Sequence, residues 1–305
     1  MASSSETRLA YIAESTWGTT PSSPTWATAR MTGESLNPNI ENVVSDEIRA
    51  DRNVPDLVQV GSSAGGDVNF ELSYSAFDDW LESLLYGAWT TNVLKNGLAE
   101  SSFTLEKTFE TGATDQYHRL TGSIANSLTL TMGVDSIVTG NFNFLSKEMT
   151  SAQAEIGSST YNAAVANPVI NAAANFASLT MTGVTSPALM AVNMTITNNL
   201  ANQRQLGSLA SRGIRTGRFE VSGNITAYFE NAELFELFLA GTASDLSFKL
   251  GGASSKNYVF DLPNIKFETA SVVAGANDQA LVVEMSYRGL YDSGDAATLK
   301  ITRTA

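Results

Sequence analysis

One strand–helix unit occurs twice in this chain, and the repetition is the strongest constraint on its fold. Residues 66–87 read GDVNFELSYSAFDDWLESLLYG, and residues 217–241 read GRFEVSGNITAYFENAELFELFLAG. In each unit polar and apolar residues first alternate, as in a half-buried strand, and apolar residues then recur at helical spacing. The terminal glycines, Gly87 and Gly241, lie 154 positions apart, which is about half of the 305 residues. We therefore expect two copies of one fold.

Each predicted helix has its own start and stop signals. Ser75 is the expected N-cap of the first helix, with Asp78 three residues later, and Gly87 is expected to end it. Asn231 and Gly241 are the corresponding residues of the second helix. The apolar stripes of both helices are expected to pack on their strands as core.

Short alternating segments separated by turns surround both units. This pattern indicates a mainly β fold, with two tandem small β-sandwiches or partly closed barrels, each flanked by one α-helix. Residues 150–178 are small, polar and rich in alanine, so the linker is placed there. The predicted domains are residues 1–150 and residues 151–305.

The sequence offers little of the chemistry that enzymes use. It has no cysteine and one histidine, His118, so disulfides, thiol nucleophiles and most zinc sites are excluded. Phosphate-binding and hydrolase motifs are absent. Asp78 and Asp79 are adjacent, and neighbouring residues on a helix do not face each other. No catalytic, metal or cofactor site is predicted, although a hydrolase whose carboxylates come from distant strands stays open.

The charge balance is acidic, with a net charge of −13. Residues 1–150 contain 19 acidic and 8 basic residues, which accounts for most of the excess. Proteins that grip nucleic acid use Lys and Arg to neutralise phosphates, so this balance argues against such a grip. It still permits a protein that must avoid holding nucleic acid. No apolar run is long enough to span a membrane as a helix, and no secretion signal is recognised, so synthesis in the cytoplasm is expected.

Several segments, in order along the chain, carry a family resemblance. They include YIAESTWGTTP, TGESL, EIRADR, GDVNFELSY and FDDWLESLL, followed by SFTLEKTF, YHRLTGSIANSLTLTM, VTGNFNF, YVFDLPNIKF and EMSYRGLYD. Together they resemble the major tail tube proteins of long-tailed bacteriophages, in the branch with two domains per chain. The resemblance covers most of the chain and is weakest at about 150–190.

The resemblance implies a structural virion protein rather than an enzyme. In this family six β-sandwich domains form a ring around a channel, and the rings stack into a tube that conducts phage DNA from capsid to host. Three two-domain chains would supply one pseudo-hexameric ring, which explains the doubled unit. The implied partners are the chain itself and the tape-measure, tail-tip and tail-terminator proteins, with assembly in the host bacterial cytoplasm. DNA is expected to pass without specific binding.

Two groups of residues follow from this implied assembly. The polar face of each inner strand is expected to line the channel, where carboxylates would repel phosphates; its residues are Asp67, Asn69, Glu71, Ser73, Glu220, Ser222, Asn224 and Thr226. The irregular segments 41–65 and 201–216 correspond to the long loops that reach a neighbouring ring. Their expected contact residues are Glu47, Arg49, Asp51, Arg52, Arg204, Arg212 and Arg215.

Other classes of protein share some of these features. The tube protein of a contractile injection machine has the same fold but is usually shorter and has a single domain. A surface adhesin or carbohydrate-binding module should have a secretion signal and often an exposed aromatic platform. An outer-membrane barrel needs lipid-facing apolar strands repeated throughout. These alternatives stay open at this point.

Overall fold

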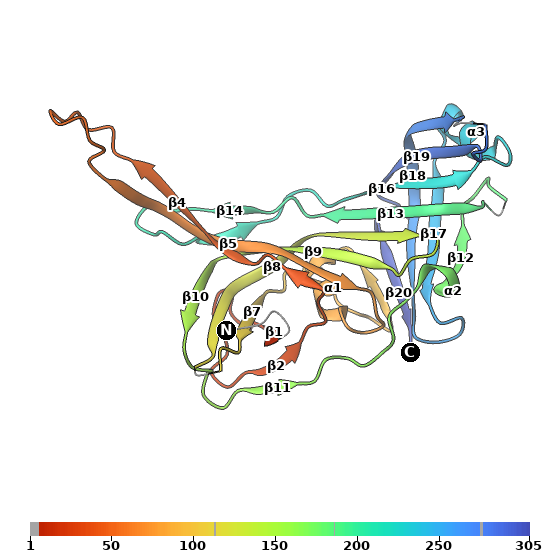
Figure 1. Cartoon of the computed structure of the whole chain (residues 1–305). Helices are drawn as coiled ribbons and strands as arrows, with labels where there is room; N and C mark the ends of the chain where they lie inside the picture. The colour runs from red at the N-terminus through yellow and green to blue at the C-terminus, as the bar shows by residue number, and fades with distance from the viewer. Residues whose placement is uncertain (1–5, 113, 186, 275–276) are drawn as a thin grey trace.

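β-Strands make up most of the chain (Figure 1). The computed structural model describes residues 6–112, 114–185, 187–274 and 277–305. The prediction of a mainly β fold with sandwich-like halves and flanking helices is confirmed. The sheets of the described residues do not close into a barrel within one chain.

One antiparallel sheet, here called the long sheet, runs through both halves of the molecule. Its strand order is β4–β5–β9–β8–β13–β16–β19–β18, with β3 beside β5 ahead of β4. The strands are β3 (Gly33–Glu34), β4 (Asn37–Val44), β5 (Leu57–Glu71), β8 (Gln116–Gly133), β9 (Thr139–Ser146), β13 (Leu189–Thr197), β16 (Glu220–Tyr228), β18 (Asn257–Val273) and β19 (Val282–Gly289).

The second half repeats the strand order of the first. In the first half β5 leads through helix α1 to β7, β8 and β9, and in the second β16 leads through α3 to β17, β18 and β19. Both β8 and β18 are long strands that change partners along their length, and each has a register shift, at Ala125/Ser127 and at Phe267/Thr269. Such bulges bend a strand and let it join two sheets. The halves meet where β8 pairs with β13 over seven residues.

In each half a second layer of strands covers the buried face of the long sheet. In the first half it consists of β1 (Thr7–Ala13), β2 (Thr25–Thr28), β7 (Phe103–Phe109), the start of β8, β10 (Glu148–Ala152) and β11 (Thr160–Asn162). In the second half it consists of β12 (Phe176–Thr180), β17 (Ser244–Gly251), the start of β18, β20 (Lys300–Thr304) and β6 (Val93–Lys95). Because β6 comes from the first half, the first half supplies one strand to the second sandwich.

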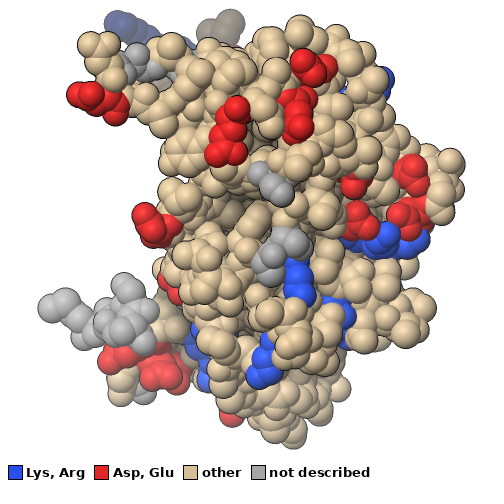
Figure 2. Space-filling view, turned by 90° about the vertical axis from the view of Figure 1, so that its right-hand side faces the viewer, with Lys and Arg blue, Asp and Glu red and all other residues tan. Residues whose placement is uncertain are grey.

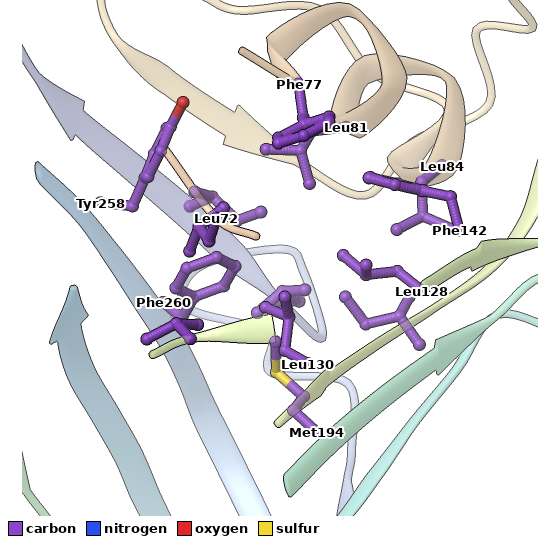
Figure 3. Close-up of a cluster of buried hydrophobic side chains, with 14 of the residues drawn as sticks. Leu72, Phe77, Leu81, Leu84, Leu128, Leu130, Phe142, Met194, Tyr258 and Phe260 are labelled. Atoms are coloured by element: carbon purple, nitrogen blue, oxygen red, sulfur yellow. The ribbon is translucent and has the colours of Figure 1, made fainter. Parts of the chain in front are cut away.

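One hydrophobic core extends across both halves. Figure 3 shows Leu72, Phe77 and Phe142 of the first half beside Met194 and Phe260 of the second. Alternation explains this arrangement, because every second residue of each long-sheet strand points to the same face. The halves are therefore packed together rather than joined only by a linker.

Helices α1 (Asp78–Leu85) and α3 (Glu233–Ala240) follow β5 and β16, and a short helix, α2 (Ala172–Asn175), precedes β12. Gly241 ends α3 in a left-handed conformation, as predicted, but the N-cap of α3 is Ala232 and not Asn231, which lies one residue earlier and whose side chain accepts from the Glu233 amide. The prediction for the first helix is wrong at both ends, because its N-cap is Phe77 without a side-chain bond, and Tyr86 takes the left-handed position.

The start of α1 differs from its prediction because of a contact from the second half. The Ser75 amide donates to the Tyr258 hydroxyl at 2.7 Å, and this hydroxyl donates to the Asp78 carboxylate. Ser75 is thus held outside the helix by a residue 183 positions away. Gly87 has a separate reason to be glycine, since a Cβ there would lie 2.3 Å from the Lys95 carbonyl oxygen.

The region between the halves lies along the first half. β10 pairs with β8, β11 pairs with β2, and Val169 forms a bridge with Ser73. Residues 148–171 therefore add to the first sandwich before the chain enters α2. The division of the chain at residue 150 stays a prediction.

Candidate channel face and assembly surfaces

The long sheet has one buried face and one polar face. In β5 the buried Val68 and Phe70 alternate with Asp67, Asn69 and Glu71, which are accessible to solvent. In β16 the buried Val221 and Ile225 similarly alternate with polar residues, which are Glu220, Ser222, Asn224 and Thr226. Seven of the eight residues predicted for the channel thus share one face.

Ser73 does not share this face. It lies beyond the end of β5, is fully buried and is covered by the bridge to Val169. The alternation of β5 continues in the sequence past Glu71, but the segment from the domain boundary crosses the strand there. A channel role for Ser73 is not supported by this position.

The polar face also includes residues that the sequence analysis did not select. Asn141 and Asn143 of β9 donate to Asn69 and Asp67, both at 2.7 Å. Across the junction between the halves, the hydroxyls of Thr129 and Thr195 lie 3.4 Å apart. The signal was the same alternation in the segments NSLTLTM, NFNF and AVNMTIT. A continuous polar face therefore crosses both halves.

Carboxylates are prominent on this face, but some are paired. A hydrogen bond from Arg218 lowers the pKa of Glu220, which keeps this carboxyl ionised. Arg288 pairs with Glu268 at the end of the face formed by the second half. On the side of the molecule that Figure 2 shows, most residues are uncharged, and the acidic and basic residues form small separate groups.

A long hairpin, here called the arm, projects from one end of the long sheet. It comprises β4, the first part of β5 and the loop between them, and it extends well beyond the rest of the molecule (Figure 1). The predicted contact residues Glu47, Arg49, Asp51 and Arg52 are exposed near its tip. Arg49 and Asp51 pair with each other at 2.9 Å, so they also stabilise the tip locally.

The loop of the second half lies against the base of the arm. This loop carries a small hairpin, β14 (Ala201–Gln203) with β15 (Gly213–Arg215). Arg204 pairs with Glu41 of the arm at 2.7 Å, and the Ser62 amide donates to the Leu209 carbonyl at 2.8 Å. Arg212 and Arg215 are exposed. The two predicted contact segments are thus brought together at one end of the sheet.

The arm is more apolar than the sequence analysis suggested. Its exposed hydrophobic side chains are Ile40, Val43, Val44, Ile48, Val54, Leu57, Val58 and Val60. Contiguous exposed apolar surface marks contact sites in soluble proteins. The segments ENVV and LVQV carried this signal, but the charged residues around them were selected instead.

Comparison with known proteins shows the family of the chain. The sequence matches the family described as phage tail tube protein over residues 4–289. The chain belongs to this family. Tail tube proteins are a structural family, so the chain is a structural component of a phage tail. A search of curated proteins found no match to it.

Asp78, Asp79 and His118 of this tail tube protein have structural partners. Asp78 accepts from Tyr258 and pairs with Arg303, both of the second half, and Asp79 accepts from Tyr11 at 3.1 Å. His118 lies in β8 against the Phe109 ring, and burial lowers its pKa. Among the described residues no cluster of His, Asp and Glu could hold a metal ion, and none of their helices could cross a membrane.

Proposed function

We propose that three copies of this chain form a ring, that rings stack into the tail tube, and that phage DNA passes through its channel. The observation that carries the proposal is the junction between β8 and β13. There the sheet of one half continues into the sheet of the next with complete antiparallel pairing. Repeating this junction between chains would close three long sheets into one barrel.

The dimensions and polarity of such a barrel suit a channel. Three long sheets supply about two dozen strands, more than the 16–18 strands that already leave an aqueous channel in porins. The polar face would line the lumen, and its carboxylates would repel phosphates. Ring closure would also cover the free sheet edges, which otherwise pair with other chains.

Stacking is assigned to the arm and to the loop beside it. Both lie at the same end of the long sheet, so each ring would present three arms to the next ring. The heterologous contact between the two ends of successive rings produces an open filament rather than a closed particle. The tape-measure, tail-tip and terminator proteins are the proposed partners within the channel and at the ends, with assembly in the bacterial cytoplasm.

Electron microscopy of the purified, untagged protein across a concentration series tests the proposal, with sedimentation as a second readout. Rings or striated hollow tubes with three-fold averages are expected. A strictly monomeric protein that bound glycans on an array would instead support the adhesin alternative. Monomers that assemble only on added tail-tip complexes would still support a tube.

Reversing charge on the polar face should turn a channel that releases DNA into one that retains it. The variant replaces Glu71 and Glu284 by lysine. Glu284 pairs with Thr226 and lies on the same face, so two negative charges of this face become positive in every chain. We expect tubes of the variant to retain short duplex DNA at low salt, with affinity that falls steeply with salt concentration because counterions are released. Wild-type tubes should retain none, as measured by co-sedimentation.

The matched control replaces Glu110 and Glu155, two exposed carboxylates away from the polar face, by lysine. This variant has the same net charge but should not retain DNA inside the tube. Equal retention by both variants would mean that net charge, and not the face, governs binding.

A further inference from the structure

The long sheet ends in two edges that have no neighbouring strand among the described residues. At one end β3 and the start of β4 pair only with β5, over residues 33–39. At the other end the last part of β18, residues 269–273, pairs only with β19. The internal repeat allows a prediction of how these two edges fit together.

Strand registers give the correspondence between the halves residue by residue. In each half, one row of residues paired from strand to strand crosses the sheet. The two rows are equivalent because each includes the residue two positions after the register shift, Thr129 in β8 and Ser271 in β18. These rows are Gly33–Asn69–Asn141–Thr129 and Ala191–Thr226–Glu284–Ser271. Gly33 therefore corresponds to Ala191, and Thr129 corresponds to Ser271.

The junction within the chain then specifies a junction between chains. Thr195, four residues after Ala191, pairs with Thr129, and Met194 pairs with Leu130. The equivalent residues are Asn37, four residues after Gly33, and Leu36 just before it. In a ring, Asn37 of one copy would face Ser271 of the next, and Leu36 would face Val272.

In the single chain, however, the backbone of Leu36 is already occupied. Its amide donates to Oε2 of Glu34 at 2.7 Å, and its carbonyl oxygen accepts from Nζ of Lys107 at 2.6 Å. Glu34 and Lys107 also pair with each other at 3.0 Å, and both side chains are largely buried. These two residues, here called the latch, therefore cover the polar groups that a neighbouring strand would need.

The latch is absent from the corresponding place in the second half. Glu34 corresponds to Val192, which follows Ala191. Lys107 corresponds to Phe248, since Lys107 pairs with His118 and Phe248 with Phe260 at equivalent places of the two sandwiches. Both Val192 and Phe248 are buried and apolar, and there the sheet continues directly into β8. The Glu34–Lys107 ion pair thus occurs in the half where, in the proposed ring, the strand next to β3–β4 would come from another copy of the chain.

The grooves beside β3 and beside β13 also differ between the two halves. An open groove of about 1020 Å³ lies beside β3, lined by Thr7 and Gly33 among others. The corresponding hollow beside β13 measures only about 260 Å³, and Met132 and Val134 of the first half form one of its walls. The groove beside β3 is therefore the larger of the two.

We propose that the last part of β18 of a second copy pairs with β3–β4 in the register of the β8–β13 junction, and that the Glu34–Lys107 latch keeps this edge closed until it does so. The proposal rests on the ring of the proposed function and gives its contact residue by residue. Pro38, at the place of Ile196, has no amide hydrogen to donate, so the edge is further protected from pairing with other strands.

Disulfide trapping tests the register, because the natural chain has no cysteine. Asn37 and Ser271 correspond to Thr195 and Thr129, whose hydroxyls lie 3.4 Å apart at the junction within the chain. In the variant Asn37→Cys with Ser271→Cys, the two thiols should therefore lie close enough to form a disulfide. Mild oxidation of assembled rings should give dimers and trimers on a non-reducing gel, with no larger species. Asn39→Cys with Thr269→Cys should behave in the same way.

Exchanged pairs are the matched controls. Asn37→Cys with Thr269→Cys, and Asn39→Cys with Ser271→Cys, are out of register by two residues and should cross-link at least tenfold more slowly. Rings that cross-link equally well in exchanged pairs, or only in them, would overturn the register but leave the ring intact. Absence of rings in every variant and in the wild type would instead contradict the proposed function.

The latch is tested by giving the first half the apolar character of the second. In the variant Glu34→Val with Lys107→Met, the concentration needed for half-maximal ring formation should fall at least tenfold, as measured by sedimentation. Lys147→Met with Glu148→Val removes a more exposed ion pair, 3.7 Å long, and should leave this concentration unchanged. Glu34→Gln, which keeps the shape of the side chain, should give an intermediate value. An unchanged or higher concentration in both Glu34 variants would overturn the latch.

Discussion

Tubes should disappear while rings remain when Val43 and Val58 are replaced by lysine and glutamate. The two valines face each other across the arm hairpin, and they are 55% and 48% exposed in the single chain. The substitutions place opposite charges on the pair, which preserves the hairpin. They remove apolar surface that would be buried between rings, where a fully buried valine contributes about 1.5–3 kcal/mol.

The effect should be large because it is repeated in every chain. Three arms per proposed ring each lose two apolar side chains, so a modest loss per valine is enough to prevent stacking. Negative-stain microscopy should show separate rings at concentrations where the wild type forms tubes. Leu98→Lys with Tyr291→Glu, which changes two exposed apolar residues outside the arm, is the control. Normal tubes from the Val43/Val58 variant would exclude the apolar arm as the stacking contact.

Replacing Trp80 by alanine should strongly destabilise the folded chain. Trp80 is fully buried in α1, and its ring lies nearly perpendicular to those of Phe142 and Phe144, at centroid distances of 5.4 and 5.0 Å. Removing a buried aromatic side chain from a core costs about 3–5 kcal/mol. The loss should also affect the second half, because one core spans both.

Denaturant unfolding of the unassembled chain gives the measurement, with the free energy of unfolding extrapolated to water. Tyr291→Ala, at a 63% exposed position, should change this free energy by less than about 0.5 kcal/mol. A loss below about 1 kcal/mol for Trp80→Ala would show that the site collapses around the missing ring. Separate unfolding transitions for the two halves would contradict the shared core.

The sequence predicted the features that depend on local periodicity. Alternation in β5 and β16 correctly separated the polar face from the core, because one face of each strand is buried. The stop at Gly241 followed from the backbone freedom of glycine at a left-handed position. The positions of Ser73 and Ser75 could not be predicted in this way, since a crossing segment and Tyr258 from distant parts of the chain decide them.

The arm shows a different limit of sequence reasoning. The sequence analysis treated residues 41–65 as an irregular segment, whereas the structure pairs their two ends as β4 and β5. Only the fold shows that no other layer of the described chain covers this hairpin and that its apolar residues face solvent. The latch was likewise invisible, because Glu34 and Lys107 are 73 residues apart and act on the backbone of a third residue.

Carrying two sandwiches in one chain has a consequence for how such a tube can change over evolutionary time. In the proposed ring of three chains, a substitution in one half changes three of the six sandwiches and leaves the three sandwiches of the other half unchanged. The halves can therefore specialise, one for contacts that are formed during synthesis and the other for contacts that wait for a partner. A ring of six identical single-domain chains has no such freedom, because every change is imposed on all its interfaces at once.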